Sequence, residues 1–338
     1  METPTVRWGI IGPGRIAQSA VIPALHHAIN ATPYAVASRD PKRAKRLAAR
    51  MSIPKAYGDY ESLLDDPEVD AVYIAVPNGL HAEWVCKAAA AGKHVLCEKS
   101  ISLNLEDAKR MRGSCWSSGV HLMEAFMYRH HPQWAKVEDL VRNGHLGHII
   151  SVDARLSGHV GAEDHRWDPD LGGGALFDVT CYGINVARLV FDAEPTSVQA
   201  VADWDERGTD RSSRVIMTFP EGGHAGAWGS FEGFGGQSVH IVGTDGEIYL
   251  ERPFVTHFDP VDIILRRFGS VERVQVGGAN HYLHMVEYFS QAVLEDQPLD
   301  HPGEDGVANV AVCVAARWSA SRSGDPIPSF KTPIPELL

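Results

Sequence analysis

Cysteine is scarce in this sequence, and no two cysteines are spaced as a metal-binding or disulfide pair. The 338 residues contain 5 cysteines, an odd and scattered set without a Cys-x-x-Cys spacing. Such thiols are typical of buried side chains in a reducing compartment, so no disulfide framework is predicted. The first residues also lack the charged region, long apolar stretch and small-residue cleavage site of a signal peptide. We therefore expect a cytoplasmic protein.

Long apolar runs and an excess of positive charge are also missing. The most apolar late stretch, Val307 to Val314, is far shorter than the ~20 residues that span a bilayer. The 31 Lys and Arg residues are outnumbered by 43 Asp and Glu residues, which gives a formal charge of -12. Because such a surface repels phosphate backbones and anionic lipids, neither nucleic acid nor a membrane is expected as a partner. A local basic pocket is compatible with this balance.

The first third of the sequence alternates short apolar runs with segments of helical period. The runs are Val6 to Ile11, Tyr34 to Ala37, Ala71 to Val76, His94 to Cys97, and His121 to Glu124. Two of the helices between them have clear starts, because Asp40 precedes Pro41 at a first helical position and Asn104 can cap the next turn. This alternation predicts a doubly wound α/β domain with a parallel sheet over residues 1–125.

After about residue 125 the strand-like runs follow one another, separated by glycine-rich turns. They are Ile149 to Leu156, Ser197 to Ala202, Arg214 to Phe219, Ala225 to Phe231, and Ser238 to Gly243. Helices are expected near residues 133–143, 175–191, 281–295 and 304–321. Consecutive strands joined in this way predict an α+β domain over residues 126–338, with a largely antiparallel open sheet.

A G-x-G-x-x-A fingerprint joins the first predicted strand to the first predicted helix. Gly12 permits a tight turn, Gly14 lets a pyrophosphate approach the backbone, and Ala17 lets the helix pack closely. The first helical amides, at Arg15 and Ile16, then face the phosphates. A turn that binds nothing is the alternative, but its position after the first strand of an alternating domain favours a dinucleotide in a Rossmann fold.

The end of the second strand indicates which nicotinamide cofactor is bound. An acidic residue there accepts hydrogen bonds from the ribose 2′-hydroxyl of NAD, whereas this sequence has Ser38 and Arg39. A hydroxyl and a guanidinium suit a 2′-phosphate. Asp40 is the competing candidate for NAD(H), although its position before Pro41 fits a helix cap better. We predict NADP(H), with NAD(H) as the alternative.

Two more polar elements follow the third and fourth strands, at the edge of a parallel sheet where ligands bind. They contain Pro77, Asn78 and His81, and then Glu98 and Lys99. With the fingerprint, they resemble the Gfo/Idh/MocA oxidoreductases, which have an Asn-x-x-His element and a Glu-Lys-Pro element carrying the catalytic lysine. The resemblance spans nearly the whole chain and implies that these five residues contact the cofactor.

A glycine-rich turn and a helix in the second domain extend the resemblance. Residues 166–182 read RWDPDLGGGALFDVTCY, and together with the stretch Met123 to Pro132 they are similar to NADP-dependent D-xylose and trans-dihydrodiol dehydrogenases. Inositol dehydrogenases have histidine where this chain has Tyr182. The resemblance implies a homodimer or homotetramer formed through the open sheet. It also implies catalytic roles for Lys99, Asp178 and Tyr182, cofactor contacts from Arg166 and Trp167, and substrate contacts from Lys99, Tyr128, His165, Trp167, Asp178 and Tyr182.

Lys99 and Tyr182 form a chemically sensible pair for moving the hydroxyl proton while a hydride leaves the same carbinol carbon. A free phenol has a pKa of ~10, so it needs a nearby cation such as Lys99 to stabilise the phenolate. Asp178 stands four residues before Tyr182, one turn away on the same helix face. Three glycines before that helix are expected to let its start approach a ligand. Ser100 departs from the family proline, so the lysine loop is expected to be strained or reshaped.

The 17 histidines do not predict a metal site. The pairs His130-His131 and His281-x-x-His284 come nearest to ligand spacing, but neither has the His-Glu-x-x-His arrangement or a Cys/His set. We interpret them as surface histidines of helices.

The sequence therefore predicts an NADP-dependent oxidoreductase that acts on a cyclic sugar, an aldopyranose such as D-xylose or D-glucose. Reduction of a keto sugar and oxidation of a trans-dihydrodiol are the nearest alternatives. More distant ones are an NAD-dependent glycosidase, which Ser38 and Arg39 disfavour, and an NADP-binding regulator without turnover, which the presence of Lys99 and Tyr182 disfavours.

Overall fold

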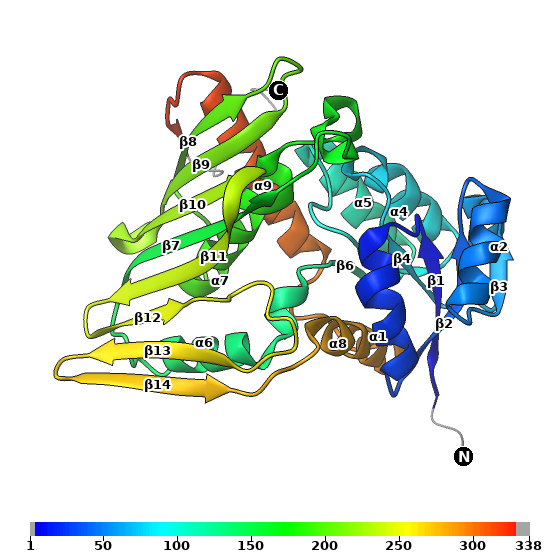
Figure 1. The fold of residues 1–338 in the computed structure, drawn as a ribbon, viewed down its shortest axis with the longest axis horizontal. Helices are drawn as coiled ribbons and strands as arrows, with labels where there is room; N and C mark the ends of the chain where they lie inside the picture. The colour runs from blue at the N-terminus through cyan, green and yellow to red at the C-terminus, as the bar shows by residue number, and fades with distance from the viewer. Residues whose placement is uncertain (1–3, 329–338) are drawn as a thin grey trace. The chain divides into compact units, whose positions relative to one another are not determined.

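Six parallel strands of the first unit form one sheet in the order β3-β2-β1-β4-β5-β6 (Figure 1). The computed structural model describes residues 4–328. The strands are β1 (Val6–Ile11), β2 (Ala31–Ala37), β3 (Lys55–Tyr57), β4 (Ala71–Ile74), β5 (His94–Cys97) and β6 (Leu122–Glu124). The chain reverses its direction of travel across the sheet between β1 and β4, and ligands of such sheets bind at the carboxyl ends beside this point.

Helices connect these strands, and their starts follow the sequence signals. They are α1 (Ile22–His27), α2 (Pro41–Arg50), α3 (Tyr60–Leu64), α4 (His81–Ala90) and α5 (Leu105–Ser117). Asp40 caps α2 by accepting a 2.8 Å hydrogen bond from the amide of Lys42. Asn104 caps α5 in the same way through the amide of Asp107, also at 2.8 Å. Both predicted caps are confirmed.

The first unit is completed by a helix from late in the sequence, α8 (His281–Glu295). This helix packs beside α1 and against β1 and β2 (Figure 1). The indole nitrogen of Trp8 in β1 donates a 3.0 Å hydrogen bond to the hydroxyl of Ser290, and the Trp8 and Phe289 rings lie 5.3 Å apart. By its contacts the chain divides into residues 1–130 with 280–310 and residues 131–279 with 311–338. The sequence-based boundary after residue 125 remains a prediction.

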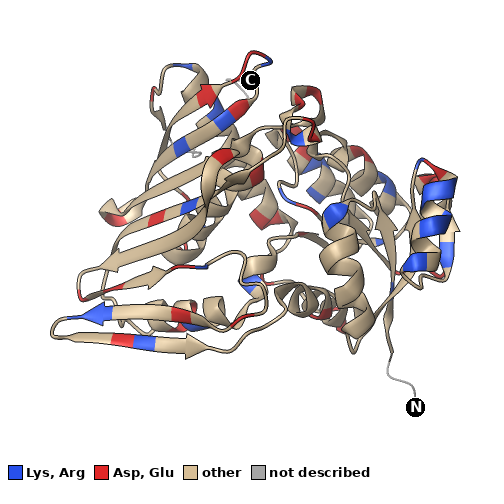
Figure 2. Ribbon diagram, viewed as in Figure 1, with Lys and Arg blue, Asp and Glu red and all other residues tan. Residues whose placement is uncertain are grey.

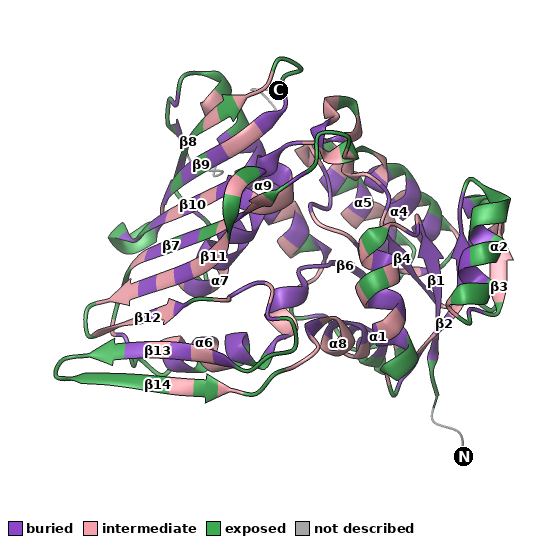
Figure 3. Cartoon of the chain, in the orientation of Figure 1, coloured by how far each residue is buried: buried purple, intermediate pink, exposed green. Residues whose placement is uncertain are grey.

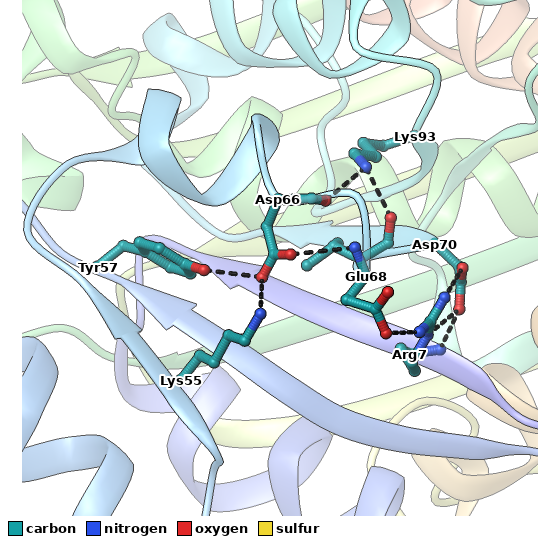
Figure 4. A network of polar contacts seen from close by, with 8 residues as sticks. Arg7, Lys55, Tyr57, Asp66, Glu68, Asp70 and Lys93 are labelled. Atoms are coloured by element: carbon teal, nitrogen blue, oxygen red, sulfur yellow. Dashed lines mark hydrogen bonds and ion pairs between the residues drawn. The ribbon is translucent and has the colours of Figure 1, made fainter.

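A polar network fixes the amino ends of the strands, opposite the edge that carries the candidate site (Figure 4). Arg7 at the start of β1 donates from Nε and Nη2 to the two carboxylate oxygens of Asp70, each at 3.0 Å. The buried Lys93 donates to the carbonyls of Asp66 and Val69, each at 2.8 Å. Beyond these amino ends, strands β1 and β4 are almost wholly buried (Figure 3). Their apolar side chains form the core of the unit.

The second unit contains a mixed nine-stranded sheet in the order β14-β13-β12-β11-β7-β10-β9-β8-β15. Its strands β7 and β10 pair in parallel and all its other pairs are antiparallel. In chain order they are β7 (Ile149–His159), β8 (Ser197–Trp204), β9 (Asp210–Thr218), β10 (His224–Ser230), β11 (Glu232–Gly243), β12 (Gly246–Leu250), β13 (Val261–Arg267), β14 (Ser270–Val276) and β15 (Ile327–Pro328). The predicted fold class, a parallel α/β domain followed by an α+β domain with a largely antiparallel sheet, is confirmed.

Helices of the second unit are α6 (Pro132–Arg142), α7 (Cys181–Phe191) and the later part of α9 (Gly303–Ser321). The helix α7 packs against β7 and β10. The stretch Pro169–Phe191, which includes α7, is long and apolar enough by length and composition to cross a membrane. Within it, 78% of the most apolar window is buried inside the protein, as in the core helix of a soluble protein.

Strand β14 and the histidine pairs depart from the sequence interpretation. Strand β14 has the sequence SVERVQV, which lacks the strict apolar alternation by which a strand is recognised, and its residues are mostly exposed. His131 and His281 are only 1% and 6% exposed, so their interpretation as surface residues is wrong. Backbone contacts explain part of this burial, since His131 accepts from the amide of Gln133 at 3.1 Å. Among residues 4–328, no group of three or more His, Cys, Asp or Glu is placed to hold a metal ion.

Candidate functional site

The two glycines of the fingerprint turn after β1 differ in their surroundings. The backbone conformation and packing require glycine at position 12, whereas the space beside Gly14 is open. Gly12 has φ +73°, and a Cβ there would lie 2.6 Å from a methyl of Val76 and 2.9 Å from its amide nitrogen. A Cβ on Gly14 would come no closer than 3.7 Å to the chain, at the carbonyl of Ala75. Behind this turn Ala17 is fully buried. The first amides of the following helix therefore adjoin a turn whose outer side a phosphate can approach.

The residues after β2 combine a buried hydroxyl with an exposed guanidinium. Ser38 is buried, and its hydroxyl accepts a 3.3 Å hydrogen bond from the amide of Asp40. Arg39 is exposed and interacts with the phenol of Tyr60. Burial raises the pKa of Tyr60, and the positive charges of Arg39 and Arg43 oppose that rise. The side chains of Ser38, Arg39 and Tyr60, each of which can hydrogen-bond a phosphate or a ribose, thus lie beside the carboxyl end of β2.

Arg43 is a candidate cofactor residue that the sequence interpretation missed. It donates a 3.2 Å hydrogen bond to the carbonyl of Pro13, inside the fingerprint turn. The available signal was its place in the first turn of α2, directly after the predicted pair Ser38 and Arg39. Tyr60 gave no comparable signal, since only the folded chain brings it beside these arginines.

His81 links the loops that follow β4 and β5. It is fully buried, with Nε2 2.9 Å from the carbonyl oxygen of Val76 and Nδ1 3.0 Å from that of Ser100. Burial lowers the pKa of His81 to about 4, so the ring is neutral at pH 7. A neutral imidazole has a single N–H, which it donates to one of these carbonyls. Direct contact of His81 with a cofactor remains a prediction, whereas its contacts with the Lys99 loop are part of the structure.

The loop that carries Lys99 is held from two sides. The peptide bond between Lys99 and Ser100 is cis. Glu98, before Lys99, accepts a hydrogen bond from the hydroxyl of Tyr73. After it, the amide of Ile101 donates a 2.7 Å hydrogen bond to Glu124, at the end of β6. Lys99 is partly exposed, whereas Ser100 is buried.

In the second unit, Arg166 joins the predicted site residue Asp178 to a second carboxylate, that of Asp164. It donates to both oxygens of Asp164, from Nε and Nη2 at 3.0 Å each, and from Nη1 to Asp178 at 3.4 Å. These hydrogen bonds hold the pKa of Asp164 far below its usual range and raise the pKa of Arg166. Asp164 and Arg166 are therefore both charged at neutral pH.

The remaining predicted contact residues differ in their exposure. Trp167 is buried, donates its indole N–H to the carbonyl of Val160 at 3.2 Å and packs at 5.2 Å against Phe231. His165 is exposed, with Nδ1 3.2 Å from Asp164. Tyr128, in the first unit, is fully buried. Their roles toward a cofactor or substrate stay predictions.

The segment that carries Asp178 is not the regular α-helix expected from the sequence. Leu176–Thr180 is a π-helix, and the α-helix that carries Tyr182 begins only at Cys181. Side chains of β9 hold both ends of this wide turn. Asp210 accepts a 2.6 Å hydrogen bond from the amide of Leu176, and the hydroxyls of Thr180 and Ser213 lie 2.7 Å apart. Such π-helical turns occur frequently at functional sites.

The packing of the turn against Asp210 explains why a glycine precedes this segment. Gly174 has φ +124°, and a Cβ there would lie 2.1 Å from the carboxylate of Asp210. The glycine-rich turn was expected to let the helix start approach a ligand. The structure instead shows that Gly174 lets the helix start approach Asp210. Tyr182 follows on this helix, buried at 6% exposure with its ring 5.2 Å from that of Phe254.

The predicted residues of the first unit gather at one edge of one sheet, after the carboxyl ends of β1, β2, β4 and β5. That edge and the fingerprint define a dinucleotide-binding oxidoreductase domain. The comparisons with known proteins agree. Residues 6–126 match the oxidoreductase family with an NAD-binding Rossmann fold, and residues 134–249 match the GFO/IDH/MocA C-terminal domain.

Several relatives match over nearly the whole chain. An oxidoreductase of Rhizobium meliloti without an assigned substrate is 38% identical, covering 94% of this chain and 97% of that protein. A D-xylose 1-dehydrogenase (NADP⁺) of Haloferax volcanii is 37% identical over 85% and 88% of the two chains. The solved structure of a 3-ketoreductase from Actinomadura kijaniata with NADP and TDP-benzene has a TM-score of 0.88 and 31% identity, and covers 93% and 98%. A trans-1,2-dihydrobenzene-1,2-diol dehydrogenase of Xenopus tropicalis is 32% identical over 63% of this chain and 65% of that protein.

This chain belongs to the Gfo/Idh/MocA oxidoreductase family. The predicted family, enzyme class and nicotinamide cofactor are confirmed, since the named relatives are dehydrogenases and reductases and several are NADP-dependent.

Proposed function

We propose that this chain is an NADP-dependent dehydrogenase of a neutral cyclic sugar, an aldopyranose such as D-xylose or D-glucose. The observation that carries the proposal is the set of polar residues at the carboxyl ends of β1, β2, β4 and β5, which combines a phosphate turn, an arginine pair and a lysine. The relatives named above support a sugar-related reaction.

The first unit supplies the groups that bind the dinucleotide. The amides after Gly14 receive the pyrophosphate, and Ser38, Arg39 and Arg43 receive the 2′-phosphate. Arginine suits this role because its planar guanidinium pairs bidentately with phosphate oxygens. When bound, NADP accepts or donates the hydride.

The proton of the reacting hydroxyl moves through Lys99 and Tyr182. The Lys99 ammonium stabilises the developing phenolate, and the phenol exchanges the proton with the substrate oxygen. Asp178, paired with Arg166 at 3.4 Å, orients a neighbouring substrate hydroxyl. The Lys99 loop is held by three contacts: Nδ1 of His81 lies at the Ser100 carbonyl, Glu98 accepts from the amide of Lys99, and Glu124 accepts from the amide of Ile101.

The charges around Asp178 favour a neutral substrate. Arg166 is already paired with Asp164 and Asp178. An anionic group of a substrate would have to compete with these carboxylates for the guanidinium, whereas the hydroxyls of a neutral sugar can donate to the carboxylate oxygens. This argument favours the oxidation of a free aldopyranose.

Keto-sugar reduction and trans-dihydrodiol oxidation remain the nearest alternatives, because both use the same hydride and proton positions. A redox-neutral glycosidase would bind NAD, which Ser38 and Arg39 disfavour. A regulator without turnover would not need the held lysine loop.

The open sheet of the second unit is proposed as the contact surface of a homodimer or homotetramer. Its strands β8 and β9 expose Val201 and Ile216, at 58% and 48%. Apolar side chains on a sheet face are typical of surfaces that associate.

The decisive experiment screens aldoses, keto sugars and dihydrodiols with NAD and NADP, following the absorbance of the reduced nicotinamide. We expect turnover of a neutral aldopyranose with NADP. The variant Arg39→Ala should raise the KM for NADP at least about tenfold, the size of one lost charged phosphate contact, with the KM for NAD as the internal control. Preference for NAD, release of an aglycone without net reduction, or no turnover on any substrate would overturn the proposal.

A further inference from the structure

One helix of the first unit carries positive charge out of proportion to the chain. The sequence of α2, PKRAKRLAAR, has five cations in 10 residues and no acid, whereas the whole chain has a formal charge of -12. In Figure 2 the ribbon of this helix is blue, the colour of Lys and Arg, over much of its length. Such a concentration in an acidic protein requires an explanation beyond solubility, because net negative charge already provides that.

The packing of α2 divides these cations into two groups. Ala44, Leu47 and Ala48 are buried and attach the helix to the unit. Arg43 bonds to the carbonyl of Pro13, and Arg50 bonds to the side-chain oxygen of Gln18. These two arginines therefore tie α2 to the fingerprint turn and the helix after it.

The other three cations, Lys42, Lys45 and Arg46, lie on the exposed face of the same helix. Within residues 4–328, the carboxylate of Asp40 lies 4.0 Å from Arg46, and it also caps α2. Surface pairs at this distance are weak. The positive charge of this face is thus available to molecules that approach the fingerprint turn.

The cofactor is the ligand whose charge fits this face. NADPH carries a pyrophosphate and a 2′-phosphate, so a chain with twelve excess negative charges repels it on average. A local patch of the opposite sign overcomes that repulsion and raises the rate of encounter, by about 10-fold to 1000-fold in strongly steered systems. Steering requires proximity to the binding site but no contact in the complex.

We propose that Lys42, Lys45 and Arg46 form a steering face that attracts the phosphates of NADP(H) toward the turn at Gly12 to Ala17. This inference rests on the proposed cofactor binding and adds a kinetic role for residues that do not touch the bound cofactor. The steering face acts on the association rate constant, and Arg39 and Arg43 act on the dissociation rate constant.

The test compares two triple variants in stopped-flow binding of NADPH to the full chain, without substrate. One is Lys42→Gln/Lys45→Gln/Arg46→Gln. The matched control is Lys109→Gln/Arg110→Gln/Lys136→Gln, which removes the same charge from α5 and α6. All six side chains are partly or fully exposed, so both variants should fold, and thermal unfolding checks this.

At low ionic strength we expect the α2 variant to bind NADPH about tenfold more slowly than the wild type, with an unchanged dissociation rate constant. The control should change by less than about twofold. Salt should remove the difference, because the Debye length falls from ~10 Å at 0.1 M to ~3 Å at 1 M. NADH, which lacks the 2′-phosphate, should show a smaller effect.

An equal loss in both variants, a change confined to the dissociation rate constant, a difference that persists at high salt, or association limited by a first-order step would each overturn the steering role. If the wild type fails to bind NADPH at all, the proposed function fails instead. The two failures are therefore distinguishable in the same experiment.

Discussion

The carboxylate of Asp210, at the start of β9, accepts a 2.6 Å hydrogen bond from the amide of Leu176, the first residue of the π-helical turn that carries Asp178. This contact joins the sheet of the second unit to the turn that carries Asp178 and precedes the helix of Tyr182. Asp210 is 5% exposed, and burial raises its pKa to about 7, against the opposing effects of the Leu176 amide and Arg317. Asp178 adds to the rise by repulsion.

Asp210 should make the stability of the protein depend on pH. Its pKa is higher in the folded chain than the value of about 3.9 in an unfolded one, so the folded state binds the proton more tightly. This contribution is fully present below pH ~4 and is lost as the pH rises through ~7. The thermal midpoint of the wild type should therefore fall from pH 5 to pH 8. That of Asp210→Asn, which keeps an oxygen for the Leu176 amide, should fall less over the same range. Equal pH dependence in both proteins would show that Asp210 does not titrate in this range.

Gly174→Ala should disturb the same contact from the other side. The new Cβ would lie 2.1 Å from the Asp210 carboxylate, at a backbone angle of φ +124° that alanine rarely adopts. We expect a loss of about 1–3 kcal/mol in stability and a lower kcat, because the turn before Tyr182 shifts. Gly235→Ala is the control, since a Cβ there meets nothing within 4 Å and its φ is not positive. A Gly174→Ala protein as stable and active as the control would contradict this account.

The parts of the site that the sequence predicted are those with local signals. The turn at Gly12, the caps at Asp40 and Asn104, and the placement of Lys99 after a buried strand each follow from a few neighbouring residues. Parallel strands bring such turns to one edge whatever the details of packing. For this reason the position of this edge could be predicted from the sequence, while the contacts of its residues with the cofactor stay predictions.

The parts that were missed depend on contacts between distant segments. Asp210 acts on Leu176, 34 residues away, and α8 packs against β1 from the far end of the sequence. The segment around Asp178 is a π-helix and not the expected regular helix, because two side chains of β9 hold its ends. No periodicity within residues 175–191 records those partners, so local patterns could not reveal them.

Lys99→Ala and Tyr182→Phe test the proposed proton transfer. Each should lower kcat by about 10²-fold to 10⁴-fold, the usual contribution of a positioned acid or base. NADPH affinity should change little in Tyr182→Phe, which keeps the aromatic ring packed against Phe254. The double variant should lose little more than either single one, because the two groups act as a unit. Additive losses, or wild-type turnover in Tyr182→Phe, would remove the phenol from the mechanism.

His81 should connect acid sensitivity with the Lys99 loop. Burial lowers its pKa to about 4, below the value of ~6.5 in an unfolded chain. The resulting stability is present above pH ~6.5 and is lost as the pH falls toward ~4. His81→Gln retains one donor for the carbonyls of Val76 and Ser100 but has no group that titrates there. We therefore expect its thermal midpoint to fall less than that of the wild type between pH 7 and pH 4.5. Its kcat should be reduced while its KM for NADPH stays within about twofold, because His81 reaches the reaction through the loop that holds Lys99. A large rise in that KM with unchanged kcat would instead place His81 in direct contact with the cofactor.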